Sequence, residues 1–153
     1  MFSSLFGGTK RKLPEPEPEV EFSLLTDLAF IPTKANFTDA GYDLFATRDC
    51  EIPVGKKGII DTQVTVRFPL GYCGLIQGRS GLAFNHSILA HPGIVDYGYS
   101  GPIKVALFNL GQTGFRVKKG NRIAQIVITK IHQAPGKPEQ TRRGASGFGS
   151  SGE

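Results

Sequence analysis

The sequence contains no tryptophan, one methionine, two cysteines, and no apolar run of the roughly 18 residues that a membrane-spanning helix needs. Cys50 and Cys73 are too few to cross-link a secreted fold, so we expect reduced thiols in an intracellular protein of the cytoplasm or nucleus. The first basic residues follow a very short apolar patch, which is not the order of a secretory signal. No long helical period is visible, which argues against a helical protein.

Glycine and proline are abundant instead, with 20 and 10 residues in a chain of 153. Hydrophobic residues make up 39% and charged residues 20%, which is typical of a globular domain with a buried core. Short apolar segments recur between turn residues, at 22–31, 59–68, 72–76, 103–110, 115–117 and 123–131. Many short strands at close spacing predict an all-β sandwich, jelly roll or barrel, and only residues 80–89 suit a short helix.

Both ends differ in composition from the middle of the chain. Residues 1–21 hold a basic triplet and alternate proline with glutamate, and residues 134–153 are rich in glycine, serine and proline. Such segments cannot bury themselves, so we expect a flexible N-terminal extension (1–21) and a flexible C-terminal arm (134–153) around a β domain (22–133). Arginines and hydroxyls among glycines make the arm suitable for a polyphosphate.

One stretch, GIVDYGYSGPIKVALFN at 93–109, has the composition of a β-hairpin with turn residues Gly98 and Gly101. An acid, Asp96, and two tyrosines are set into it. Glycines beside an acid and an aromatic ring indicate a backbone that approaches a flat ligand closely. A surface hairpin with a solvated aspartate is the alternative.

Three further stretches carry polar groups that suit an anion or a metal. GRSGLA at 78–83 combines a guanidinium, a hydroxyl and a glycine N–H in an anion-binding corner, although such a sequence is often a simple turn. AGYDLFA at 40–46 isolates Asp43, which suits either the outer shell of a metal or a turn cap. NRIAQIVI at 121–128 sets Gln125 among aliphatic residues, where its amide needs a backbone or ligand partner.

The three histidines show no metal-binding spacing with cysteine, and we expect them to be structural or at the surface. A net charge of +5 is compatible with nucleic acid or with a small polyphosphate. Stable nucleic-acid binding is not expected, because the aromatic residues do not alternate with a continuous basic stripe.

Together with RGASGFGSSG at 143–152, these stretches resemble the five motifs of the trimeric deoxyuridine triphosphatases (dUTPases), in the family's order and approximate spacing. The resemblance covers about residues 24–152. It implies a distorted β-barrel or jelly roll that hydrolyses dUTP to dUMP and pyrophosphate, with Mg²⁺ across the triphosphate. It further implies a homotrimer whose active sites are shared between chains. Such an enzyme limits uracil incorporation into DNA and supplies dUMP for thymidylate synthesis.

The resemblance also implies roles for individual residues. Asp96 would orient and deprotonate the attacking water, Tyr99 would pack under the deoxyribose, and Asp43 would act through metal-bound water. The other implied contacts are to uracil from Gly93, Ile94, Val95 and Lys104, to phosphates from Arg79, Ser80 and Gly81 with Gln125 in support, and from the arm through Arg143, Phe148, Gly149 and Ser150.

Two alternatives are open beside this reading of the motifs. The related dCTP deaminases carry a glutamate three residues before the equivalent of Asn109, where this chain has Ala106, which cannot shuttle protons. A catalytically inactive dUTPase-like regulatory or interaction protein is the other alternative. Against it stands the joint presence of Asp96, Arg79 and Tyr99 with the arginine and phenylalanine of the arm.

Removing residues 1–20 should change neither the catalytic rate nor the melting temperature, because the alternating prolines and glutamates contain nothing that packs. Pyrophosphate release and thermal unfolding of the truncated and full chains check this. A melting temperature lowered by several degrees would make the extension part of the fold.

Overall fold

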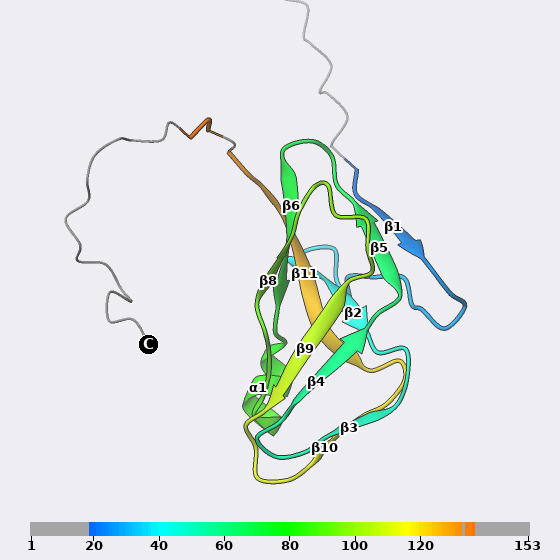
Figure 1. Cartoon of the computed structure of the whole chain (residues 1–153), viewed down its shortest axis with the longest axis vertical. Helices are drawn as coiled ribbons and strands as arrows, with labels where there is room; N and C mark the ends of the chain where they lie inside the picture. Colours follow the sequence, from blue (N-terminus) through cyan, green and yellow to red (C-terminus); the bar gives the residue numbers. More distant parts are fainter. Residues whose placement is uncertain (1–18, 133, 137–153) are drawn as a thin grey trace, which may run out of the picture.

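The computed structural model describes residues 19–132 and 134–136 of the chain (Figure 1). Within them the chain forms short strands and one helix. The strands are β1 (Glu21–Leu24), β2 (Gly41–Phe45), β3 (Cys50–Ile52), β4 (Lys57–Asp61), β5 (Val64–Arg67), β6 (Tyr72–Gln77), β7 (Ile88–Ala90), β8 (Gly93–Val95), β9 (Lys104–Asn109), β10 (Phe115–Val117) and β11 (Arg122–Lys130), and the helix is α1 (Ser80–His86).

All strand pairs are antiparallel and form four sheets. The largest has the order β2-β11-β6-β8, the next has the order β4-β9-β7, and β1-β5 and β10-β3 form pairs. The arrangement is jelly-roll-like and does not close into a barrel within the described residues, so the all-β prediction is confirmed in its jelly-roll form. The short helix is also present, although it ends at His86 and the rest of the expected segment forms β7.

Alternation of side chains along the strands builds one hydrophobic core. In β5, Val64 and Val66 are buried while Arg67 is exposed, as a half-buried strand requires. The same alternation buries Val105 and Leu107 of β9. The largest fully buried apolar side chains are Leu44, Ile52, Ile60, Ile88, Ile103, Leu107, Ile123 and Ile126. Among the described residues, no helix is long and apolar enough to cross a bilayer.

The apolar segment 59–68 forms two strands in different sheets and not one continuous strand. The break lies at Gln63, whose φ of 56° is left-handed. The Asp61 carboxylate accepts a hydrogen bond from the Gln63 N–H at 2.9 Å, which stabilises this unusual conformation. The chain therefore leaves the β4 sheet and enters β5, which pairs with β1.

The segment 93–109 is not a paired hairpin, contrary to its composition. β8 pairs with β6, whereas β9 pairs with β4 and β7, so the two arms lie in different sheets. Each arm obtains its backbone hydrogen bonds from other strands, a tertiary preference that local composition does not encode.

Asn109, at the end of β9, is 1% exposed and fully hydrogen-bonded. Its amide nitrogen donates to the carbonyls of Ile52 and Thr113, both at 2.8 Å, and its Oδ1 accepts from the Gly111 N–H at 2.9 Å. One side chain thereby joins β9 to β3 and to the loop that leads into β10.

Asn109→Ala should lower the free energy of unfolding by about 2–4 kcal/mol, because several buried polar groups lose their partners at once. Urea unfolding at one fixed protein concentration measures the change. Asn85→Ala, at an exposed position of α1, is the matched control and should stay within about 0.5 kcal/mol. Equal losses in the two variants would contradict the structural role of Asn109.

Candidate active site

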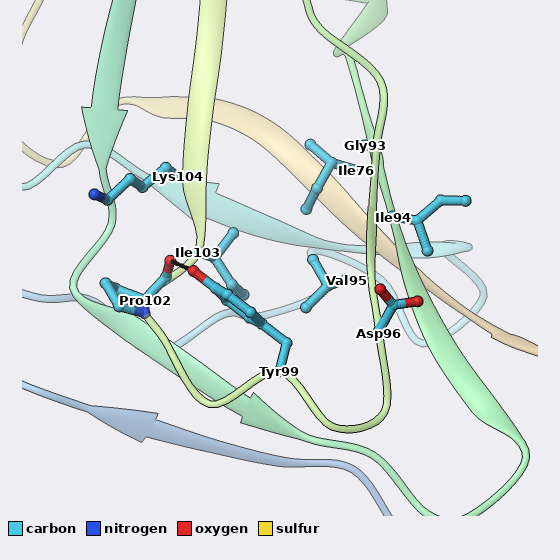
Figure 2. A pocket seen from close by; sticks show the side chains of 9 residues that line it. All are labelled: Ile76, Gly93, Ile94, Val95, Asp96, Tyr99, Pro102, Ile103 and Lys104. Atoms are coloured by element: carbon cyan, nitrogen blue, oxygen red, sulfur yellow. Dashed lines mark hydrogen bonds between the residues drawn. The ribbon is translucent and has the colours of Figure 1, made fainter.

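A cavity of about 220 Å³ lies between β8 and the start of β9 (Figure 2). Apolar side chains of β6 and β8, together with Pro102 and Ile103 just before β9, form its walls, and Asp96 and Tyr99 stand in the loop that joins β8 to β9. The lining residues are Ile76, Gly93, Ile94, Val95, Asp96, Tyr99, Pro102, Ile103 and Lys104. This cavity brings together six of the predicted site residues. They are Gly93, Ile94, Val95 and Lys104, assigned to the base, Tyr99, assigned to the sugar, and Asp96, assigned to the attacking water.

Backbone groups face the cavity because β8 and β9 are not paired with one another. β7 covers β9 only from Leu107 onward, and the Ala106 carbonyl accepts from the His91 N–H at 2.8 Å. Backbone groups of alternate residues point to the same edge of an antiparallel strand, so those of Lys104 face the side where β8 lies. The cavity therefore offers main-chain donors and acceptors beside apolar walls.

Asp96 follows β8 directly and is exposed. Its carbonyl accepts from the Tyr99 N–H at 3.0 Å, which closes a tight turn. Within the described residues its carboxylate makes no hydrogen bond or ion pair, so it is available to a water molecule or a ligand. The Tyr99 hydroxyl donates to the Pro102 carbonyl at 3.0 Å, which holds the ring across the loop (Figure 2).

A second cavity lies where β2, β11 and the β6–α1 turn meet. It gathers a further group of predicted residues, namely Asp43, Arg79, Ser80, Gly81 and Gln125, with Gly41, Arg122 and parts of the 35–40 segment. Strand register explains the grouping, because Gln125 of β11 stands opposite both Asp43 of β2 and Gln77 of β6. Directly paired residues of an antiparallel sheet project to the same face.

Ion pairs with Asp43 hold the two arginines of this second cavity, Arg79 and Arg122, in place. The Asp43 carboxylate, 16% exposed, binds Arg79 Nε at 3.1 Å through one oxygen and Arg122 Nη1 at 3.3 Å through the other. Arg79 also donates to the Arg122 carbonyl at 3.4 Å. Two guanidinium groups share the Asp43 carboxylate, and a second carboxylate, Asp39, also lines the cavity, so the formal charges balance. What the cavity offers an anion is guanidinium N–H donors held in a fixed orientation.

The Gln125 side chain forms a hydrogen bond with the backbone. Its Nε2 donates to the Gly78 carbonyl at 3.0 Å and thereby ties β11 to the turn that carries Arg79. Its Oε1 lies over Gly41, where a Cβ atom would come within 2.5 Å. Gln125 thus contacts both the turn before Arg79 and Gly41, and its support of phosphate binding stays a prediction.

Arg122 is the site residue that sequence reasoning missed. It stands at a register shift of β11, between its pairing with Phe45 and the pairing of Ala124 with Leu44. A bulge redirects the side chains around it, and here Ile123 and Ala124 are both buried in succession. The signal available in the sequence was this break in the period-2 alternation just before the predicted Gln125.

The two cavities share no lining residue. β2 and β8 form opposite edges of the four-stranded sheet, three strand spacings or roughly 14 Å apart. One copy of the chain therefore presents the base-type cavity and the anion-type corner as two cavities with different lining residues. The predicted site residues Arg143, Phe148, Gly149 and Ser150 lie outside the described residues.

No group of three or more histidine, cysteine or acidic side chains that suits a metal occurs within the described ranges. His86 packs on Phe115 and His91 on Phe108, with ring centroids 5.4 and 6.4 Å apart, as expected of structural histidines. Both cysteines are free thiols, and burial raises the pKa of the Cys50 thiol.

Comparison with known proteins finds one family, by a family model and by curated relatives. A family model described as dUTPase matches residues 28–152. The deoxyuridine 5'-triphosphate nucleotidohydrolase of Saccharomyces cerevisiae is 40% identical over 138 residues, covering 87% of this chain and 94% of its own length. The same enzyme from Rattus norvegicus is 38% identical over 149 residues, covering 95% of this chain and 73% of its own.

Solved structures agree with the sequence relatives. The Staphylococcus bacteriophage 80alpha dUTPase with dUPNHPP has a TM-score of 0.75 and 30% identity, covering 88% of this chain and 98% of that one. A mutant dUTPase from phage phi11 of S. aureus, described with a structural Mg(II) ion, has a TM-score of 0.75 and 25% identity, covering 80% and 97%.

Proposed function

This chain belongs to the dUTPase family, and from that premise we propose which of its residues carry out the reaction. The protein is a dUTP diphosphatase, which hydrolyses dUTP to dUMP and pyrophosphate. Its activity limits uracil incorporation into DNA and supplies dUMP for thymidylate synthesis. The observation that best supports the residue assignments is the cavity between β8 and β9, which ends at an exposed carboxylate.

Uracil occupies this cavity in our proposal, with its polar edge on the backbone of residues 93–95 and of Lys104. Backbone donors and acceptors stand there at strand edges that no other strand within 19–132 covers. A slot framed by two strands has little width for thymine's methyl group, and cytosine presents the wrong donor pattern to fixed backbone groups. The apolar walls, Ile76 and Ile103, exclude water from the base.

Tyr99 stands at the mouth of the same cavity, and we assign its ring to the deoxyribose. A ring held by the Pro102 carbonyl forms a fixed wall, against which a ribose 2′-hydroxyl would collide. The triphosphate extends toward Arg79, Ser80 and Gly81 of the second cavity. There the ion pair with Asp43 already orients the Arg79 guanidinium. Preorganised donors of this kind stabilise charge that develops in the transition state.

Asp96 acts as the general base. Its carboxylate takes a proton from a water molecule, and the resulting nucleophile attacks the α-phosphorus while the bond to the pyrophosphate oxygen breaks. In such an in-line displacement most of the catalysis is positioning and charge neutralisation, so one carboxylate with several donors suffices.

The residues fit a magnesium ion that the substrate carries and that no dedicated protein cage holds. Mg²⁺ keeps several waters and commonly binds through substrate phosphates, and within the described residues no carboxylate cluster competes for it. When bound, Mg²⁺ would neutralise phosphate charge. We propose that Asp43 contributes mainly by orienting Arg79, since both of its oxygens are engaged by arginines, with contact to the metal's water as a further role.

A homotrimer with shared sites is the assembly we propose. The base cavity and the anion corner have no lining residue in common on one chain, and in the proposed trimer a second copy brings its corner to the first copy's cavity. The C-terminal arm then closes the site, with Arg143 at the terminal phosphates, Phe148 on the uracil, and Gly149 and Ser150 over the phosphates. This last step depends on the resemblance of the motif at 143–152.

Asp96→Asn should lower turnover by about 10²- to 10⁴-fold and leave dUTP affinity nearly unchanged, because the amide keeps the shape but cannot accept the proton. Single-turnover kinetics with dUTP and calorimetric binding of a non-hydrolysable analogue measure the two effects. Turnover within a few-fold of the unmodified protein would contradict the assignment.

Light scattering should give three times the 16.5 kDa mass of the chain, and refolding two inactive variants together should restore activity. Asp96→Asn and Arg79→Ala chains, unfolded together and refolded, form trimers in which some sites combine an intact Asp96 from one chain with an intact Arg79 from another. The control is the same two variants refolded apart and then mixed. No recovered activity in the co-refolded sample, or a monomeric active particle, would refute shared sites.

A further inference from the structure

The loop between β8 and β9 contains two glycines, Gly98 and Gly101, which differ in their surroundings. A Cβ atom built on Gly98 meets nothing within 4 Å. A Cβ atom built on Gly101 comes 2.6 Å from the Tyr99 hydroxyl oxygen, 2.8 Å from Cζ and 3.3 Å from Cε2. Neither glycine has the left-handed φ found at Gly55, Gly71 and Gly120. Backbone conformation therefore permits alanine at both positions, and only the space differs.

The Tyr99 ring occupies the space that a side chain at residue 101 would fill. The ring folds back over its own loop, and its hydroxyl donates to the Pro102 carbonyl at 3.0 Å (Figure 2). A second hydrogen bond, from the Tyr99 N–H to the Asp96 carbonyl at 3.0 Å, fixes the base of the side chain. The ring can take this position only because residue 101 has no Cβ atom.

A collision at this point would be relieved by the ring. The atoms that the added Cβ would meet are at the far end of a side chain that is 45% exposed, whereas the loop backbone is constrained by Pro102 and by the buried Ile103. An added methyl group would therefore turn Tyr99 away from the Pro102 carbonyl and leave the strands in place. The expected effect falls on the cavity wall and not on the fold.

We infer that Gly101 is a positioning residue for substrate selection: its missing side chain sets the place of the Tyr99 ring and, through it, the discrimination between deoxyribose and ribose. The second half of this inference depends on the proposed function of Tyr99 at the sugar. The first half, the dependence of the ring position on Gly101, stands on geometry alone.

The test compares Gly101→Ala with Gly98→Ala, a matched control in the same loop, in the full chain with magnesium. Pyrophosphate release from dUTP and from UTP gives kcat/KM for each. For Gly101→Ala we expect the ratio of dUTP to UTP to fall by about 10- to 100-fold, since a misplacement of about 1 Å costs on the order of 10²-fold. Gly98→Ala should keep the ratio of the unmodified protein, and the two variants should melt at the same temperature.

A double-mutant cycle separates action through Tyr99 from a general effect. In a Tyr99→Ala background the added methyl group meets no ring, so Gly101→Ala should change the dUTP to UTP ratio no further. An unchanged ratio in the single variant overturns the inference. So does an equally large further loss in the Tyr99→Ala background, or a lowered melting temperature with an unchanged ratio.

A crystal structure of the Gly101→Ala variant tests the positioning without any activity. The Tyr99 hydroxyl should lie beyond hydrogen-bond distance of the Pro102 carbonyl, and a ring still in place overturns the inference. Failure of the proposed function looks different, because the unmodified protein would then release no pyrophosphate from dUTP. If it does turn over dUTP while Tyr99→Ala keeps full discrimination against UTP, the role of Tyr99 at the sugar is wrong, and with it the selection half of the inference.

Discussion

The site depends on one feature of the hydrogen-bond network: β8 and β9, adjacent in sequence, are bonded to other strands and not to each other. A paired hairpin would satisfy its own backbone and leave no cavity. Here β6 holds one arm while β4 and β7 hold the other, so backbone groups at facing edges stay open to a ligand. Unpaired strand edges are normally a liability, and a base bound between them uses the same donors and acceptors for recognition.

The anion corner depends on a different device, the register of β11 between β2 and β6. The register places Gln125 opposite Asp43 and Gln77, and the bulge at its start directs Arg122 to the same carboxylate as Arg79. Asp43 and Arg79 are both partly buried, so the cost of removing their charges from water offsets much of their attraction, and the value of this cluster lies in orientation. Asp43 accepts from Arg79 Nε and the Arg122 carbonyl accepts from Arg79 Nη1, which leaves the remaining N–H groups of this guanidinium to an oxyanion.

The loop between β8 and β9 then positions two side chains, Asp96 and Tyr99, at the cavity that the strands form. Tyr99 is exposed enough to contact a ligand, yet two hydrogen bonds and the empty space at Gly101 determine where its ring stands. The same loop begins with Asp96, so the turn that orients the ring also orients the carboxylate. The proposed sugar wall, Tyr99, and the proposed general base, Asp96, are thereby placed by one short turn, which the Asp96 carbonyl and the Tyr99 N–H close.

The sequence by itself determined the all-β class, the short helix, most strand segments and the residue types of both site halves, because period-2 alternation, turn residues and motif chemistry are local. It did not separate the arms of 93–109, break the segment 59–68 at Gln63, or bring Arg122 to Asp43. Only the tertiary structure decided these, since strand partners and register are set by competition among distant edges for backbone hydrogen bonds and a common core. For the same reason the division of the site into two separate surfaces is visible in the fold and absent from the order of the motifs.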